Sequence, residues 1–371
     1  YVVEDIWKVT RATSQAKKHE RNPLIVGEQP WEGTGPYLHG SVLWDEDEAC
    51  FKMWYQTFHS RNAEWTDYTY EAHYATSQDG ITWHKPRLAR YEIGGTKENN
   101  VFLRGYTRLG APTILKEPRD PDPARRYKMV YLDAKPHEWD GICVAFSPDG
   151  LNWTPYEDNP VIHGHSDTHN NVLWDPALGK YVLFGRPNVY AGPWKRRIAR
   201  SESEDFIHWT ELETVFVPDE FDPPEFYGMT VFLYEGIYFG HLQVFDQEAG
   251  SIEDQLAFSR DGRNWRRTAA RETFLPLGPA GSWGCGMIFH AAGPPPLVGD
   301  EMRFYYSGWD GPHHSYQRRA AIGLATLPRD RFIALEAGEQ EGAVLTRPFI
   351  WRGEGLEFNA ECLPGAGQTG C

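Results

Sequence analysis

Ser77-Gln78-Asp79-Gly80-Ile81-Thr82-Trp83 is the first of several related stretches that decide the fold class of this chain. Close copies stand at Ser147–Trp153 and Ser259–Trp265, a degenerate copy at Ser201–Trp209, and a weaker copy at Ala325–Phe332. In the full motif, Asp accepts hydrogen bonds from nearby backbone N–H groups, Gly takes a positive φ, and Trp packs against a sheet. The copies therefore indicate tight turns that recur about every 56 to 70 residues.

Strand-like runs stand before these turns, and aromatic hairpins stand earlier in each unit. Ala72–Thr76 and Ile142–Phe146 are two such runs, and Val42–Trp44 followed by Phe51–Tyr55 is one such hairpin. A small sheet of about four strands cannot bury both of its faces alone, so the units must stack on one another. The pattern predicts an all-β fold, a five-bladed β-propeller over residues 20–335.

The pattern changes after Phe332. Two further strands are expected, at Ala343–Trp351 and Gly355–Ala360, within a C-terminal β extension that covers residues 336–371. These strands either complete the propeller or begin a β-sandwich. A β-sandwich for the whole chain is the competing fold, but it would leave the recurrence of the turn motif to coincidence.

Composition excludes several classes of protein. The chain has 371 residues, 14% of them aromatic, which excludes a disordered chain. Its net charge of −15 and the lack of a basic stripe argue against a nucleic-acid partner. No run of apolar residues is long enough to cross a membrane, so no membrane partner is expected. Compartment and oligomeric state are left open by the sequence.

Chemistry is expected where the inner strands of the blades begin, because the blades converge there on one funnel. Three carboxylates stand in those segments, Glu32, Asp167 and Glu225. Carboxylates crowded among aromatic groups have their pKa values pushed apart, which suits the acid and base of glycoside hydrolysis. The expected substrate-binding residues are His39, His169, Tyr227, Trp283, Trp31 and Arg108.

Each candidate also has a purely structural interpretation. Glu32 is equally consistent with a solvated loop acid, and Asp167 with the cap of a turn. Glu225 follows two prolines and precedes a buried-looking strand, so it is the strongest single candidate. The histidines at 163, 165 and 169 lack the spacing of a metal site, and the five cysteines form no Cys-x-x-Cys pair. Neither a metal nor a cofactor is expected.

The five units, the turn motif and the acids of the funnel resemble the five-bladed propeller glycosidase superfamily of arabinanases, β-xylosidases, invertases and levanases. The resemblance covers residues 20–335. The chain departs from it in lacking an Asn-Asp-Pro-Asn-Gly opening and in having Gly110-Ala111-Pro112 where arabinanases carry a second-blade Asp. The tail resembles the linker into a C-terminal β-sandwich. The turn motif is also similar to that of six-bladed sialidases, whose arginine triad has no counterpart here.

By this resemblance the chain is expected to be a glycoside hydrolase acting on a plant or microbial carbohydrate. Glu225 is then the general acid, Glu32 the base or nucleophile, and Asp167 tunes the acid or holds a hydroxyl. His39, His169 and Tyr227 contact hydroxyls, while Trp283 or Trp31 offers a stacking wall.

Two alternatives stay open. The first is a carbohydrate-binding propeller without turnover. The second is a phosphorylase of the same fold, which needs a cationic pocket for phosphate. Arg108, Arg197 and Arg319 are the sequence's evident sources of that charge.

Overall fold

The structure is a computed structural model, and it describes residues 3–60, 68–107, 109–134, 141–164, 166–167, 169–187, 196–268, 270–350 and 355. These residues form strands and two short 3-10 helices, with no α-helix among them. The chain divides into two compact units. The larger unit is Ala12–Ala334, and the smaller one combines Tyr1–Arg11 with Leu335–Cys371. The prediction of an all-β chain is confirmed.

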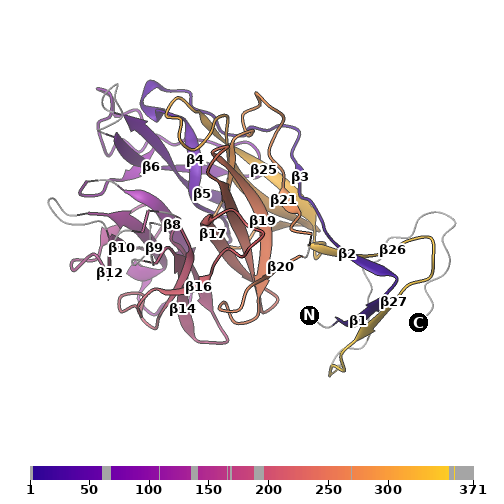
Figure 1. Cartoon of the computed structure of the whole chain (residues 1–371). Helices are drawn as coiled ribbons and strands as arrows, with labels where there is room; N and C mark the ends of the chain where they lie inside the picture. Colours follow the sequence, from indigo (N-terminus) through magenta and orange to yellow (C-terminus); the bar gives the residue numbers. More distant parts are fainter. Residues whose placement is uncertain are drawn as a thin grey trace. The chain divides into compact units, whose positions relative to one another are not determined.

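Two separate sheets come first in the larger unit (Figure 1). The first is the antiparallel β4 sheet, ordered β4-β5-β6-β7, and the second is the β8 sheet, ordered β8-β9-β10-β11 with β12 also paired to β10. Their strands are β4 (Pro36–Asp45), β5 (Cys50–Ser60), β6 (Tyr68–Ser77), β7 (Val101–Leu103), β8 (Gly110–Lys116), β9 (Tyr127–Asp133), β10 (Gly141–Ser147), β11 (Thr154–Pro155) and β12 (Ile162–His163).

The β13 sheet is ordered β13-β14-β15-β16, and a ten-stranded sheet follows it. The larger sheet consists of two antiparallel groups, β17 to β21 and β22 to β25, joined by one parallel pairing of Ile252 with Met287. We call these groups the β17 sheet and the β22 sheet. The strands are β13 (Asn171–Asp175), β14 (Lys180–Gly185), β15 (Ile198–Ser203), β16 (Glu213–Phe216), β17 (Glu225–Tyr234), β18 (Ile237–Asp246), β19 (Ser251–Ser259), β20 (Arg266–Arg267), β21 (Thr273–Leu275), β22 (Met287–His290), β23 (Leu297–Val298), β24 (Glu301–Trp309) and β25 (Ala320–Pro328).

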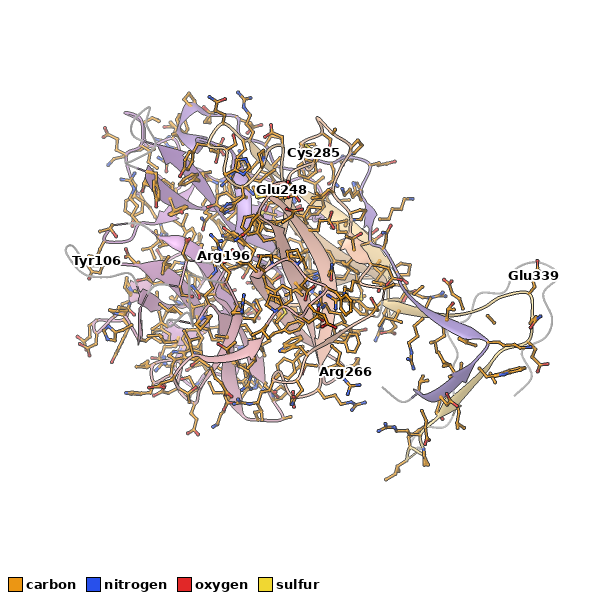
Figure 2. All side chains as sticks on the ribbon, viewed as in Figure 1. Tyr106, Arg196, Glu248, Arg266, Cys285 and Glu339 are labelled. Carbon is orange, nitrogen blue, oxygen red and sulfur yellow. The ribbon has the colours of Figure 1, made fainter. Side chains whose placement is uncertain are left out.

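The first strands of successive sheets lie against one another. Strand β4 contacts β8, β8 contacts β13, β13 contacts β17, and β22 contacts β4. The N-terminal strand β3 (Lys17–Lys18) pairs with β25, so a segment from the start of the chain is the last strand of the β22 sheet. The 3-10 helices are Pro30–Glu32 and Pro123–Arg125. Side chains fill the space between the sheets throughout this unit (Figure 2).

The recurring turns have the predicted structure. Ser77 Oγ donates to Asp79 Oδ1, which also accepts from the backbone N–H groups of Ile81 and Thr82, at 2.7 to 2.9 Å. Gly80 has a φ of 71° and donates its N–H to Ser77 Oγ. Burial opposes ionisation of Asp79, but these donors hold its pKa well below the usual range. The same hydrogen bonds recur at 147–152 and 259–264.

The degenerate copy keeps this geometry although it lacks the glycine. Phe206 stands in the glycine position with a φ of 71°, and Asp205 accepts from the N–H groups of Ile207 and His208. The Phe206 ring is fully buried and packs edge-on against Tyr181. The motif therefore begins at Ser203, and burial of the ring offsets the cost of about 1 to 2 kcal/mol that a side chain incurs in the left-handed region.

The smaller unit pairs the two ends of the chain. Strand β1 (Val3–Trp7) pairs with β27 (Ala343–Thr346), and β2 (Val9–Thr13) pairs with β26 (Ile333–Ala337). The strand predicted at Ala343–Trp351 is thus present but shorter, and it pairs with an N-terminal strand that was not predicted. The strand predicted at Gly355–Ala360 lies outside the described residues, apart from Gly355.

Within the part of the chain that the structure describes, no helix has the length and apolar character needed to cross a membrane.

Candidate active site

A cavity of about 200 Å³ lies at the end of the larger unit where the first strands of the sheets begin. The β4, β8, β17 and β22 sheets contribute to its wall, together with the segment before β13 and the segment before β25, and the wall is largely aromatic. Aromatic walls with a few polar groups are typical of sites for small molecules. The lining residues are Tyr37, His39, Gln56, Phe58, Tyr68, Tyr70, Gly110, Ala111, Leu132, Asp167, Tyr227, Met287, Phe289, Trp309, His313, Tyr316 and Arg318.

Asp167 is the carboxylate of this lining, and its side chain is about half exposed, at 49%. It lies in the segment between β12 and β13. The buried guanidinium of Arg186, just after β14, places Nη1 3.7 Å from Asp167 Oδ2. Nε and Nη2 of Arg186 donate to the backbone oxygen of Tyr227, at 3.1 and 2.8 Å. Arg186 is therefore fixed by the β17 sheet and presents its remaining nitrogen to Asp167.

A second cation reaches the cavity from the segment before β25. Arg318 lies over the ring of Trp309, 4.8 Å from its centroid, and donates to the backbone oxygens of Pro312 and His313. Nε2 of His313 lies 3.1 Å from the hydroxyl of Tyr227. Burial and the nearby Arg318 lower the pKa of His313 to about 3, so the ring is neutral at pH 7.

The floor of the cavity is polar and buried. Gln56 donates to the hydroxyl of Tyr37 and accepts from the backbone N–H of Ala111. His39 stacks on His169 with ring centroids 5.2 Å apart. Burial lowers the pKa of His39 to about 4, so this ring is also neutral at pH 7. The side chains of the floor are fixed by packing and offer uncharged hydrogen-bonding groups.

Glu225 does not line the cavity, although it is the first residue of β17. It is almost fully buried, and it accepts from the backbone N–H and the Nη1 of Arg196, at 2.9 and 2.7 Å. Gln247 donates a third hydrogen bond at 2.6 Å. Burial opposes the charge, but the Arg196 donors outweigh it and lower the pKa of Glu225. The carboxylate is therefore charged and enclosed, which differs from the environment expected of a general acid.

Glu32 is also buried away from the cavity. It ends the 3-10 helix Pro30–Glu32, and its Oε2 accepts from the backbone N–H groups of Glu28 and Gln29. Lys85 donates to its Oε1 at 2.8 Å. Glu32 thus caps a turn and pairs with a lysine. Of the three acids expected to share one pocket, only Asp167 lines the cavity among the described residues.

The remaining predicted residues divide in the same way. His39 and Tyr227 line the cavity. His169 lies directly behind His39 and is fully buried. Trp283 stacks on Tyr306 in the β22 sheet, and Trp31 packs beside Gly94, so neither belongs to the wall. Arg108 lies outside the described residues.

Arg318 and His313 line the cavity and Arg186 lies beside the lining residue Asp167, but none of the three was among the residues predicted from the sequence to bind substrate. Arg186 follows a predicted strand without any motif. Arg318 precedes Arg319, which the sequence favoured, but the backbone N–H of Arg319 bonds to Asp310 while Arg318 turns to the cavity. Adjacent side chains of an extended segment point to opposite sides, so only one of the two arginines can face the cavity. The sequence alone does not determine which one does.

No protein-family model matches the chain. Solved structures do resemble it. A glycosyl hydrolase from Bacteroides ovatus superposes with a TM-score of 0.61 at 15% identity, covering 88% of this chain and 96% of that one. A β-1,2-mannobiose phosphorylase from Listeria innocua gives 0.62 at 12% identity, covering 84% and 96%. A fructofuranosidase from Schwanniomyces occidentalis gives 0.54 at 16% identity, covering 85% and 60%.

This comparison shows that the chain has the all-β fold of these β-propeller proteins, which is the fold that the resemblance in the sequence implied. The likeness is one of fold, because these identities are low. Both hydrolases and a phosphorylase share the fold, so the fold leaves the acceptor of the sugar undecided.

Proposed function

We propose that the chain is an enzyme that cleaves glycosidic bonds, in the first place a glycoside hydrolase, with the cavity as its active site. One observation carries this proposal. The cavity combines an aromatic wall with an accessible carboxylate, Asp167, which an arginine holds in place. Aromatic faces stack on sugar rings, and a carboxylate exchanges protons with the reacting oxygen.

Asp167 is the proposed catalytic residue, because it touches the space that substrate would fill. Tyr227, His39 and Gln56 are proposed to bind sugar hydroxyls, since each lines the cavity and has a polar side chain. Tyr68 and Tyr316 are proposed to supply the stacking faces, since both line the cavity and their side chains are exposed. Glu225 and Glu32, proposed from the sequence as acid and base, are assigned instead to holding Arg196 and the turn around Lys85.

A glycoside phosphorylase is the second candidate, favoured by the cations of the cavity. Hydrolysis ordinarily uses two carboxylates, whereas the described lining contains one. Arg318 lines the same cavity, and Arg186 lies beside Asp167. In a phosphorylase, a phosphate held by such guanidinium groups attacks the sugar carbon directly. Neither an attacking water nor a second carboxylate that activates it is then needed.

We further propose that the propeller has five blades, the β4, β8, β13, β17 and β22 sheets, within residues 20–335. Five apolar clusters support this count, each shared by two successive sheets. One of them places Tyr305 and Leu324 of the β22 sheet with Met53 and Ala75 of the β4 sheet. The pairing of β3 with β25 supports a ring joined by strands from both ends of the chain. Residues 336–371 are proposed as a separate extension.

The test is a panel of aryl glycosides, mannosides and fructosides assayed in phosphate-free buffer and again with phosphate. A hydrolase releases free sugar in both buffers. A phosphorylase releases a sugar phosphate and needs phosphate for turnover. Sugar binding without turnover in either buffer would contradict the proposed enzyme and favour a carbohydrate-binding propeller. Asp167→Asn is the control that excludes a contaminating glycosidase.

A further inference from the structure

His241, Asp254 and His290 form a buried cluster away from the cavity. They lie on β18, β19 and β22, and each is at most 3% exposed. Nε2 of His290 lies 2.8 Å from Asp254 Oδ2, and Nδ1 of His241 lies 3.4 Å from Asp254 Oδ1. One donor atom from each side chain lies within 4.8 Å of the others. None of the three residues lines the proposed active site.

Polar atoms in this cluster lack hydrogen bonds. Nδ1 of His241, Oδ1 of Asp254 and Nδ1 of His290 have no hydrogen-bond partner among the described residues. Two further polar residues belong to the cluster by strand pairing. Gln243 lies opposite Asp254, and Thr230 lies opposite His241 on the paired strands. Both amide atoms of Gln243 and the hydroxyl of Thr230 are likewise buried without a partner. Unsatisfied buried polar groups are costly, so such a concentration requires a cause.

Aromatic side chains pack against the cluster, and Arg303, which lines the void beside it, forms an ion pair with Glu301. His241 is packed against Phe232, Phe274 and Phe304, with ring centroids 5.2 to 5.8 Å away. The ion pairs that the described residues form give Asp254 the two histidines and no Lys or Arg. Buried carboxylates are ordinarily paired with a cation or bound to a metal.

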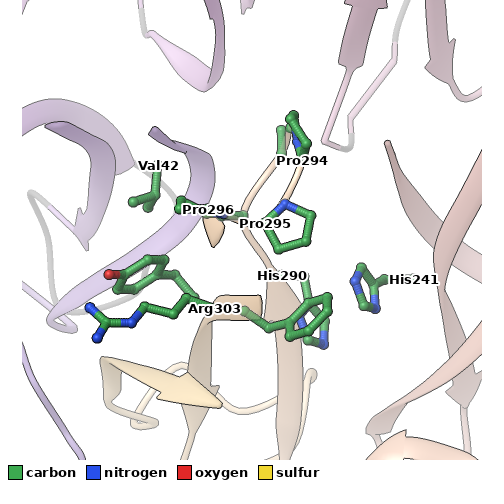
Figure 3. Close-up of a pocket in the computed structure, with 12 residues that line it drawn as sticks. Val42, His241, His290, Pro294, Pro295, Pro296 and Arg303 are labelled. Atoms are coloured by element: carbon green, nitrogen blue, oxygen red, sulfur yellow. The ribbon is translucent and has the colours of Figure 1, made fainter. Parts of the chain in front are cut away.

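A small void adjoins the cluster. It has about 10 Å³ and is lined by His241, His290, Val42 and the run of prolines at 294–296, as Figure 3 shows. The rings of His241 on β18 and His290 on β22 stack with centroids 3.8 Å apart, and Figure 3 labels both beside the void. The void is of the size of about one water molecule, so it could hold a further oxygen ligand.

We propose that His241, Asp254 and His290 bind a divalent transition-metal ion of the zinc class. Two imidazoles and a carboxylate are the donor set that such ions prefer, and three protein ligands are common where water or a fourth side chain completes the tetrahedron. Gln243, opposite Asp254, is the side chain placed to complete it. The ion joins the β17 sheet to the β22 sheet, so its role is structural and does not depend on the activity proposed above.

The test is metal binding by the intact chain. Protein stripped with a chelator is titrated with Zn²⁺ and, separately, with Co²⁺, whose visible absorption reports tetrahedral nitrogen and oxygen ligands. We expect one equivalent bound per chain and a thermal midpoint that rises with Zn²⁺. Replacing one ligand, in His290→Gln or in Asp254→Asn, should weaken Zn²⁺ binding at least about 100-fold.

His73→Gln is the matched control, because His73 is equally buried but has hydrogen-bond partners on both ring nitrogens, Thr57 and Asn100. It should bind one equivalent like the wild-type chain. Stoichiometry below one tenth in the stripped and refilled wild-type chain would overturn the proposal, as would equal Zn²⁺ affinity in the ligand variants. If the ligand variants do not fold, the Co²⁺ spectrum of the wild-type chain decides, and its absence counts against the site.

Discussion

Asp167, in the segment before β13, and Glu225, the first residue of β17, are acids with opposite environments. Asp167 is half exposed, lines the cavity and lies 3.7 Å from one guanidinium nitrogen. Glu225 has a side chain only 2% exposed and three donors within 2.9 Å. One is accessible to a substrate, and the other has its oxygens occupied by the protein itself.

The comparison shows why burial is a poor guide to catalysis in this chain. An acid that exchanges a proton with substrate must be accessible to it. The prolines before Glu225 and the apolar strand after it made that residue conspicuous in the sequence. The same features enclose it and hold it against Arg196.

Replacing Asp167 should have the largest effect. Asp167→Asn keeps the size of the side chain but removes the proton-exchanging group, so kcat is expected to fall about 10³-fold. The thermal midpoint should stay close to that of the wild-type chain, because the side chain is half exposed. Steady-state kinetics and thermal unfolding measure the two quantities. Turnover within a few-fold of wild type would remove Asp167 from the mechanism.

Replacing Glu225 should have the opposite effect, lowering stability and leaving kcat nearly unchanged. Glu225→Gln leaves the charge of Arg196 without its partner, which is expected to lower the free energy of unfolding by about 3 kcal/mol. The folded fraction should keep kcat within a few-fold. Because the pKa of Glu225 is lowered by folding, its contribution is present above about pH 4.5 and is lost as the pH falls through the lowered pKa.

Denaturant unfolding of both chains at pH 7 and at low pH measures this effect. The gap between wild type and Glu225→Gln should narrow on acidification. A variant that is stable but inactive would show that the enclosed acid takes part in the chemistry after all.

The buried histidine His39 should make the free energy of unfolding fall in mild acid. Burial lowers the pKa of His39 from 6.5 to about 4, so the unfolded chain binds more protons between those values. Stability from this group is therefore complete above pH 6.5 and is lost as the pH falls toward 4, by about 2 to 3 kcal/mol. His39→Gln should unfold with a shallower dependence on pH over that interval.

His84→Gln is the matched control, because His84 is exposed and none of the ion pairs of the described residues involves it. It should retain the wild-type pH dependence of the unfolding free energy. An unchanged slope in His39→Gln would mean that this ring is protonated in the folded chain, contrary to the structure.

The turns and the cavity also differ in how far the sequence predicts them. The turns depend on contacts within seven residues, such as Ser77 with Asp79, so their structure could be predicted even where Phe206 replaces glycine. The cavity brings together Tyr37, Asp167 and Arg318 from segments that are far apart in the sequence. Which of two adjacent arginines faces it depends on the register of a loop, and which acid remains accessible depends on where Arg196 packs. Neither is encoded locally.

Arg318 and Arg196 extend the comparison to the cations, with the smallest expected effect. Arg318 lines the cavity, whereas Arg196 is engaged with Glu225. If the cavity binds phosphate or an anionic sugar, Arg318→Met should raise the KM for that ligand about 10-fold, or about 1.4 kcal/mol, with kcat little changed. Arg196→Met should instead lower the thermal midpoint and leave KM as it was.

Kinetics with phosphate as the varied substrate separate the two, because a structural role for Arg318 would move the midpoint and not KM. Equal KM values in both variants and the wild-type chain would mean that Arg318 only packs over Trp309. They would also favour water as the acceptor of the sugar.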